Sequence, residues 1–366
     1  MLGMREKKVN ATVRTMPVTL KELAARAQVH PSTVSRVANN DPGLRIAAAT
    51  RSRIEALLRE TEYRPNGVAR GLKLRQTLVL AVVIPDITNP FFASLFRGVE
   101  DGAGPRGYQV LLCNTDGNPE RQRAHIQSLT ARRVDGMILA STFLKDPAVR
   151  WLRHQRTPYV LVNRFSEELV DPFVGSDDVM GARLATQHLI SLGHVRIGHL
   201  AGQTTISTGV LRRRGYQAAL AEAGLPFDPE LMVESGFVEE GGAHAMERLL
   251  SLQARPTAIF AATDMTAIGA YGVVRRLGLR IPEDIAIVGY NDTPSASRLI
   301  PGLTTVHVPI HDFGSVAARM LLDQIATGEL TPKRVVFAPQ LVIRGSTSPG
   351  ADAQTGGRAG PRSPTD

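Results

Sequence analysis

Ser32 and Arg36 are the two side chains of this sequence whose types and spacing best suit the reading of a nucleic acid. Residues four apart share one face of a helix. An arginine can donate two parallel hydrogen bonds to guanine, and a serine can contact a base or a phosphate. The surrounding stretch, residues 29–40, offers only Val34 and Val37 for burial. The pattern therefore predicts a helix whose polar face either touches a polyanion or is solvated.

The charge distribution favours contact with a polyanion. Residues 1–75 hold 15 Lys and Arg against 6 Asp and Glu, whereas the rest of the chain holds 28 of each. The formal net charge of +9 is therefore confined to the first fifth of the 366 residues. A local excess of this kind is typical of a module that binds nucleic acid and is joined to a neutral body. A solvated basic tail is the simpler alternative.

Three short helices are expected to position this polar face. Thr19 followed by Glu22 has the pattern of a capping box, and Pro31 suits the first turn of a second helix. With the apolar spacing, these signals place the helices at about residues 19–27, 31–38 and 47–61. Two helices joined by a tight turn, followed by a third, form a helix-turn-helix unit whose second helix enters the major groove. Residues 17–63 are thus predicted to be a small all-α DNA-binding domain.

The stretches VTLKELAARAQVHPSTVSRVANN and YRPNGVARGLK resemble the DNA-binding headpiece of the lactose-repressor (LacI/GalR) family of transcriptional regulators. The resemblance implies that Pro31, Ser32 and Arg36 read bases. Thr33 and Ser35 are better placed for phosphate or capping contacts. The expected DNA-binding residues are Thr19, Pro31, Ser32, Thr33, Ser35, Arg36, Asn39, Asn66, Arg70, Leu72 and Lys73.

Two features of this region depart from the family pattern. Gln28 stands where a turn glycine is usual, so a positive φ there would cost about 1 kcal/mol. The link NNDPGLRIA is longer than the usual one and lacks a serine cap before the third helix.

Residues 64–76, RPNGVARGLKLRQ, are too polar for a core helix and contain two glycines, each of which costs about 1 kcal/mol of helix stability relative to alanine. A generic linker is one interpretation. The family resemblance implies instead a hinge that forms a short helix on operator DNA and inserts Leu72 into the minor groove. Such apolar wedges kink the duplex. Arg70 and Lys73 would then hold phosphates.

From about residue 77 the chain alternates apolar strands with helical stretches. The strands read TLVLAVVIPD, YQVLLCNTD, VDGMILA and PYVLVNR, and then VRIGHLAG, PTAIFAAT and IAIVGYND. Near-continuous apolar strands separated by helices predict parallel sheets covered on both faces, and two such sets predict two lobes. Ligands of open α/β sheets bind beyond the carboxyl ends of the strands. The loops after these strands are therefore the candidate ligand site.

The body, residues 77–348, resembles the periplasmic-binding-protein-like (type I) effector domain of the same family, with IPDITNPFF, SLGHVRIGHLAG and IPEDIAIVGYND among the matching stretches. The resemblance implies an α/β two-lobed fold with a small effector in the cleft. The expected lobes are about 77–177 with 307–335, and about 178–306 with 336–348. The implied effector contacts are Phe91, Phe92, Asn163, Arg164, Thr208, Arg212, Phe237, Thr263 and Asn291.

The chemistry of this expected pocket favours an anionic effector. Asn163 and Asn291 stand where sugar-binding members of the family often carry acids. Arg164 and Arg212 then lack an obvious acidic partner, and a buried charge needs pairing. The carboxylate of a sugar acid or an organic acid would provide it.

Several positions also have a simpler interpretation. Phe91 and Phe92 could only pack beneath the first helix of the body. Asp178 and Asp264 open two expected helices, and N-capping is the expected role of both carboxylates.

Other classes of protein find little support. A single cysteine and the lack of an export signal predict a cytoplasmic protein without disulfides, and no apolar run is long enough to span a membrane. The spacing of His188, His194 and His199 does not suit a metal ion, and neither a G-x-G-x-x-G nor a G-x-S-x-G motif occurs. No enzyme, cofactor or metal is therefore predicted.

The sequence is interpreted as that of a transcriptional repressor that binds a pseudo-palindromic operator as a homodimer and responds to a small effector. Whether the effector releases or promotes DNA binding is left open. The alternative is the solute-binding protein of a transporter, which would have no use for residues 18–73. Residues 1–16 are expected to be a flexible extension, and residues 349–366, rich in Gly, Pro and Ser, a disordered tail.

Overall fold

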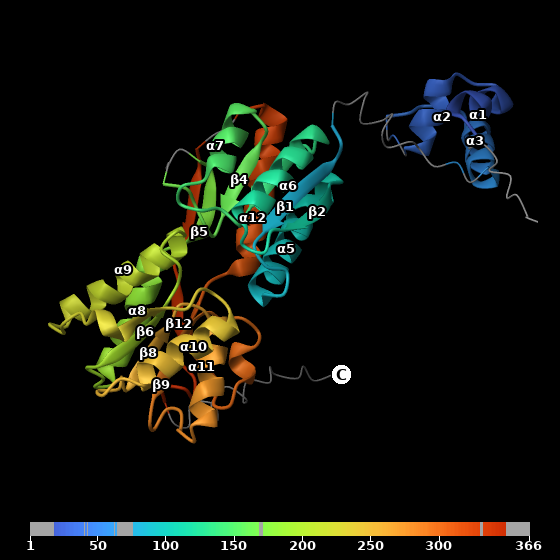
Figure 1. The fold of residues 1–366 in the computed structure, drawn as a ribbon. Helices are drawn as coiled ribbons and strands as arrows, with labels where there is room; N and C mark the ends of the chain where they lie inside the picture. Colours follow the sequence, from blue (N-terminus) through green and yellow to red (C-terminus); the bar gives the residue numbers. More distant parts are fainter. Residues whose placement is uncertain are drawn as a thin grey trace, which may run out of the picture. The chain divides into compact units, whose positions relative to one another are not determined.

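The computed structural model describes residues 18–39, 41, 43–61, 63, 76–167, 171–329 and 332–348. The chain divides into two compact units, Met1–Thr77 and Leu78–Asp366, called the headpiece and the body below (Figure 1). The expected extension at 1–16, the hinge residues 64–75 and the tail at 349–366 lie outside the described residues. None of the helices in the described ranges is long and apolar enough to cross a bilayer.

Three helices build the headpiece: α1 (Leu20–Ala27), α2 (Pro31–Ala38) and α3 (Ala48–Glu60). Their apolar faces meet in one small core of Leu23, Ala24, Ala27, Val34, Val37 and Ile54. Only two apolar side chains of α2 are needed, because α1 and α3 supply the rest of this core. The expected helix-turn-helix layout is confirmed.

The helix ends follow the capping signals of the sequence. The backbone N–H of Thr19 donates to Glu22 Oε2 at 2.7 Å, and Thr19 Oγ1 accepts from the Glu22 N–H at 3.3 Å, so the capping box is confirmed. Helix α3 starts after Ala47 without a side-chain cap. Gln28 closes α1 with φ 51°, in the left-handed region where a non-glycine residue costs about 1 kcal/mol. The expected strain at this turn is present.

Two six-stranded sheets build the body. The first has the order β11-β5-β4-β3-β1-β2 and contains β1 (Val79–Ile84), β2 (Gln109–Asn114), β3 (Gly136–Leu139), β4 (Tyr159–Val162), β5 (Phe173–Ser176) and β11 (Arg334–Phe337). The second has the order β12-β10-β9-β8-β6-β7 and contains β6 (Ile197–Ala201), β7 (Met232–Glu234), β8 (Ala258–Ala261), β9 (Ala286–Asn291), β10 (Thr304–His307) and β12 (Gln340–Val342). All pairings are parallel except that of β12 with β10.

Helices cover these sheets, as the continuous apolar strands require. The first lobe carries α5 (Pro90–Ala103), α6 (Pro119–Ala131), α7 (Pro147–His154) and α12 (Ile310–Thr327). The second carries α8 (Asp178–Ser191), α9 (Ser207–Glu222), α10 (Glu239–Leu250) and α11 (Asp264–Arg276). Short 3-10 turns lie at Gly104–Arg106, Pro229–Leu231 and Ala296–Arg298. Helices α5 and α12 lie side by side (Figure 1), so close that a Cβ at position 98 would collide with the carbonyl oxygen of His311.

The chain passes between the lobes three times: after β5, after β10, and between β11 and β12. Two expected lobe boundaries shift by a residue or two. Val336 and Phe337 belong to β11 and hence to the first lobe, and His307 still belongs to β10 in the second lobe. The shift arises because β11 stays paired with β5 as far as Phe337, and β10 stays paired with β9 as far as His307.

Candidate functional site

The polar face of α2 is exposed on the side opposite the headpiece core. Val34 and Val37 are buried, whereas the side chains of Ser32 and Arg36 are exposed to solvent. Asn39 is also exposed, and Pro31, Thr33 and Ser35 are partly buried. Helix α2 can therefore present Ser32 and Arg36 to a ligand without unfolding the core. Asn66, Arg70, Leu72 and Lys73 lie outside the described residues.

His30, which the sequence reasoning did not single out, caps the start of α2. Its Nδ1 accepts from the Ser32 N–H at 3.3 Å and lies 2.7 Å from Ser32 Oγ. At the other end, the Asn39 side chain donates to the carbonyl oxygen of Ser35 at 2.7 Å. Both contacts fix the ends of a helix of only eight residues. Pro31 signalled the start of the helix, but histidine is not one of the usual capping residues, so no signal in the sequence pointed to this cap.

Asp41 is a second residue that sequence reasoning missed. Its carboxylate Oδ2 accepts from Arg36 Nε at 2.7 Å. The hydrogen bond from Arg36, followed by one from the Gly43 N–H, holds the pKa of Asp41 below its usual value. The guanidinium at the centre of the polar face is thus tied to the link that follows α2. The unusual length of that link was the only signal in the sequence.

The expected effector residues lie at the carboxyl ends of strands from both sheets. Asn163 and Arg164 follow β4, Asn291 ends β9, and Thr263 caps α11 directly after β8. Thr208 and Arg212 lie on α9, Phe237 follows β7, and Phe91 and Phe92 lie in the first turn of α5. Two of these side chains meet across the cleft, because the Arg164 guanidinium of the first lobe lies 5.4 Å from the centre of the Phe237 ring of the second.

Phe91 and Phe92 are buried in the hydrophobic core of the body. They are 2% and 4% exposed and pack edge to face at 5.0 Å within the core. The simpler interpretation, packing beneath the first helix of the body, describes their contacts.

Arg212 has an acidic partner inside the protein. Its Nε donates to Asp178 Oδ1 at 2.8 Å and its Nη1 donates to the carbonyl oxygen of Ala262 at 2.6 Å. Its guanidinium also lies 3.7 Å above the centre of the Tyr290 ring. The prediction that Arg212 lacks an acidic partner is therefore wrong, because the fold brings the first residue of α8 against α9.

The predicted N-capping role of Asp178 and Asp264 is also wrong. The caps are the preceding residues, Asp177 for α8 and Thr263 for α11. The Asp178 carboxylate accepts a hydrogen bond from Arg212, and the Asp264 carboxylate accepts hydrogen bonds from Thr293 and Thr305. The capping residue lies one position before the predicted one in both helices, and a sequence pattern does not locate a helix end that closely.

Arg164 differs from Arg212. It is 6% exposed, its Nε has no hydrogen-bond partner, and no carboxylate among the described residues forms an ion pair with it. Burial, together with the charge of Arg212, lowers the pKa of Arg164 to about 10. The buried amide oxygen of Asn291 is likewise without a partner in the described part of the chain. This end of the cleft therefore holds one uncompensated cation and an unpaired acceptor.

Ser141 and Thr142 extend this polar set and were missed by the sequence reasoning. Both hydroxyls are buried without a hydrogen-bond partner among the described residues. They follow β3, which is the neighbour of β4 in the first sheet, so they lie at the same edge as Arg164. Two adjacent hydroxyl residues, one position beyond the strand GMIL, were the available signal.

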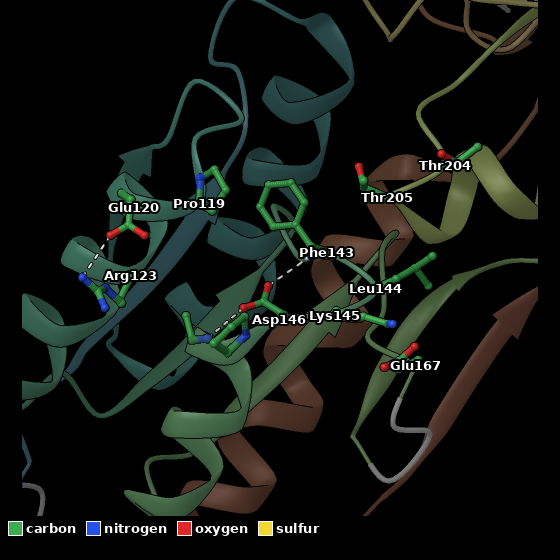
Figure 2. Close-up of a pocket in the computed structure, with 12 residues that line it drawn as sticks. Pro119, Glu120, Arg123, Phe143, Leu144, Lys145, Asp146, Glu167, Thr204 and Thr205 are labelled. Atoms are coloured by element: carbon green, nitrogen blue, oxygen red, sulfur yellow. Dashed lines mark hydrogen bonds and ion pairs between the residues drawn. The ribbon is translucent and has the colours of Figure 1, made fainter.

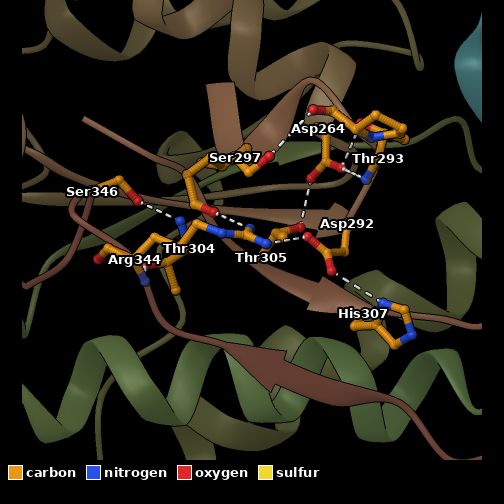
Figure 3. Close-up of polar contacts among 11 residues, drawn as sticks. Asp264, Asp292, Thr293, Ser297, Thr304, Thr305, His307, Arg344 and Ser346 are labelled. Atoms are coloured by element: carbon orange, nitrogen blue, oxygen red, sulfur yellow. Dashed lines mark hydrogen bonds and ion pairs between the residues drawn. The ribbon is translucent and has the colours of Figure 1, made fainter. Parts of the chain in front are cut away.

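Asp264 and Asp292 are the centres of a network of hydrogen bonds beside β9 and β10 (Figure 3). The completely buried Asp264 accepts from the Thr293 N–H at 2.6 Å and from Thr305 Oγ1 at 2.6 Å, and burial raises the pKa of Asp264 to about 6. Asp292 accepts from Arg344 Nη2 at 2.7 Å and lies 3.1 Å from His307 Nδ1. The network holds the turn after β9, where Asn291 has φ 110° and Asp292 has φ 55°.

The two lobes also touch at the edge of the cleft. The Leu144 N–H donates to the Thr205 carbonyl oxygen at 2.9 Å, and the Phe165 N–H donates to Ser207 Oγ at 3.1 Å. Beside these contacts lies a cavity of about 490 Å³ (Figure 2). It is lined by Pro119, Glu120, Arg123, Phe143, Leu144, Lys145, Asp146, Pro147, Ala148, Glu167, Thr204 and Thr205. None of the nine expected effector residues lines it.

Comparison with known proteins supports both halves of this description. Residues 19–66 match the model of bacterial regulatory proteins of the lacI family, and residues 186–347 match that of the periplasmic binding protein-like domain. The ribose operon repressor of Escherichia coli (strain K12) is 36% identical over 329 residues, which cover 90% of this chain and 99% of that protein.

Two solved structures are similar over nearly the whole chain. The complex of the transcriptional regulator CelR with cellobiose is 34% identical with a TM-score of 0.69, and the match covers 90% of this chain and 99% of that one. The Lac repressor dimer bound to operator and the anti-inducer ONPF is 28% identical with a TM-score of 0.81, and the match covers 91% of this chain and 99% of that one.

Proposed function

Because the chain belongs to the lacI family of bacterial regulatory proteins, we propose which of its residues carry the two activities of such a regulator. The chain is a DNA-binding transcriptional repressor controlled by a small-molecule effector. The solute-binding alternative is not favoured, because residues 19–66 match a regulatory headpiece.

In the headpiece, Arg36 donates to a guanine in the major groove and Ser32 contacts a neighbouring base or phosphate. The orientation of α2 supports these roles, since Val34 and Val37 bury one face and leave the two polar side chains on the other. The remaining contacts, mostly to the backbone, come from Thr19, Pro31, Thr33, Ser35 and Asn39. In the hinge, Leu72 enters the minor groove while Asn66, Arg70 and Lys73 hold the flanking backbone.

Gel-shift titration with Arg36→Ala tests the headpiece assignment. The variant should lose about 1–3 kcal/mol of discrimination at one base pair in each half-site. Arg59→Ala is the matched control, because it removes the same charge from an exposed position of α3. The control should weaken binding to all sequences alike. Unchanged base preference in Arg36→Ala would contradict the assignment.

In the body, the effector is a small polyhydroxylated or organic acid whose carboxylate pairs with Arg164. The observation that carries this proposal is the buried guanidinium without an acidic partner in the described chain. Removing such a charge from water is costly unless a counter-charge is supplied. Asn291, Ser141 and Thr142 offer the hydrogen bonds that orient hydroxyl groups, and Arg212 already has a carboxylate partner in Asp178.

Calorimetric titration with matched neutral and acidic sugars separates the alternatives. An aldonic or uronic acid should bind, and its neutral parent sugar should bind at least tenfold more weakly. Arg164→Gln should abolish the difference, whereas Arg214→Gln, at an exposed position of α9, should preserve it. Tight binding of ribose or cellobiose, the sugars named for the relatives, with no response to acids would refute an anionic effector.

Effector binding is coupled to DNA binding by closure of the cleft. The contacts of Leu144 with Thr205 and of Phe165 with Ser207 join the lobes, so a ligand that favours them favours one lobe arrangement. In a homodimer this arrangement sets the spacing of two headpieces on a pseudo-palindromic operator. The repressor acts in the cytoplasm, where its DNA lies, and it has no catalytic role.

A further inference from the structure

We propose that Asp41 is a positioning residue for base readout, because its carboxylate holds the guanidinium of Arg36 so that only the outer pair of N–H groups can meet a base. The inference rests on the proposed contact between Arg36 and operator DNA. It adds a residue outside α2 to the set that determines specificity.

The pair is fixed from several sides. Arg36 Nε donates to Asp41 Oδ2 at 2.7 Å. The Gly43 N–H donates to the other carboxylate oxygen at 2.9 Å, and the Asp41 N–H donates to the Arg36 carbonyl oxygen at 3.0 Å. The Leu44 N–H then donates to the Asp41 carbonyl oxygen at 3.2 Å. The carboxylate is therefore anchored to backbone and orients the arginine, rather than following it.

The contact leaves one edge of the guanidinium available. A guanidinium carries five N–H groups in a rigid planar fork. Asp41 occupies Nε through its hydrogen bond of 2.7 Å. A base therefore cannot accept two hydrogen bonds from the edge formed by Nε and Nη2, because the Nε–H is already used. The side chain of Arg36 is 49% exposed, so the outer edge, formed by Nη1 and Nη2, keeps two donors, which is the pair that O6 and N7 of guanine accept.

Two consequences for recognition follow. Adenine presents a donor where guanine presents O6, so an arginine held with its outer edge forward discriminates between them, whereas a mobile arginine can turn to a phosphate. Fixing the side chain in advance also avoids an ordering cost that corresponds to about two- to tenfold in affinity. The Asp41 carboxylate meanwhile repels phosphates, so it weakens binding to any sequence. Both effects raise the ratio of specific to non-specific binding.

The test uses the full-length protein and DNA sites selected by it from a random pool. Asp41→Asn keeps the size of the side chain and removes the charge. It should lower the preference for guanine at one position in each half-site by about two- to tenfold, while binding to non-specific DNA stays equal or becomes tighter. Asp284→Asn is the control, because it breaks an exposed aspartate–arginine pair in the body and should change neither quantity.

A double-mutant cycle separates the failure of this inference from that of the proposed function. If Arg36→Ala leaves base preference unchanged, the contact itself is refuted. If Arg36→Ala relaxes the preference and Asp41→Asn does not, only the role of Asp41 is refuted. The inference expects Asp41→Asn to change the preference in the wild-type background and to have no further effect in the Arg36→Ala background. Asp41→Ala, with its headpiece fold checked by circular dichroism, should reproduce the result.

Discussion

Replacing Arg164 by methionine should stabilise the effector-free protein while abolishing its response to effector. Burial lowers the pKa of Arg164 to about 10. At 1.36 kcal/mol per pKa unit, the buried charge costs the folded state about 3 kcal/mol. The cost is fully present at pH 7, since a lowered pKa disfavours the charged form and arginine is charged in both states there. Loss of the contact with the Phe237 ring destabilises the folded state by about 1 kcal/mol. The free energy of unfolding should therefore rise by about 2 kcal/mol in total.

Thermal unfolding with and without effector is the assay. A gain of about 2 kcal/mol raises the melting temperature of a domain of this size by roughly 4 °C. Adding effector at about 100 times its Kd should stabilise the wild type by about 2.7 kcal/mol and leave the variant unchanged, so the order of the two stabilities inverts. Arg214→Met, on the exposed face of α9, should shift neither curve by more than about 0.5 kcal/mol.

Two results would refute this reasoning. A lower melting temperature of Arg164→Met without effector would mean that the arginine is compensated in the free protein. If effector raises the melting temperature of the variant as much as that of the wild type, Arg164 does not supply the counter-charge.

Three further outcomes are expected from the buried pair, the strained turn and the buried acid. Asp178→Asn should cost about 3–5 kcal/mol in urea unfolding, because it leaves the buried Arg212 charge unpaired; a loss below 1 kcal/mol would show that the pair is solvated. Gln28→Gly should stabilise the headpiece by about 1 kcal/mol, since φ is 51° there; destabilisation would place the strain elsewhere. Burial raises the pKa of Asp264 to about 6, so the folded state keeps this proton to a higher pH than the unfolded state does. The free energy of unfolding should therefore fall as the pH rises from about 4 to about 6. Asp264→Asn should remove that part of the slope in pH-dependent melting curves, and a slope that persists in full would assign it to another group.

The sequence predicted the headpiece well because its signals are local. Thr19 with Glu22, Pro31, and the spacing of Val34 and Val37 each act within one turn of helix. The signals for the strands are also local, because a continuous apolar run predicts a strand that is buried on both faces. These patterns depend only on residues close together in the chain, so they can be interpreted without knowledge of the tertiary contacts.

The electrostatics of the cleft could not be predicted in the same way. Arg164 and Arg212 read alike in the sequence, as arginines in segments assigned to the cleft by resemblance. Asp178 pairs with Arg212 across 34 residues of chain, and no described acid reaches Arg164. Whether a charge is compensated depends on which distant residue the fold brings within about 4 Å. Sequence spacing carries no such information.

By itself, the sequence determined the helix-turn-helix, the two-lobed α/β body and the face of α2 that carries Ser32 and Arg36, because periodicity and capping are local properties. Only the tertiary structure decided that Arg212 is neutralised while Arg164 is not, that Asp264 buttresses the turn after β9, and that Asp41 holds Arg36. Asp178 and Arg212 lie on different helices, Asp264 and Thr305 lie on a helix and a strand, and Asp41 lies in the link five residues after Arg36. Their geometry is set by packing, and packing fixes the orientation and the charge state of each group that meets DNA or effector.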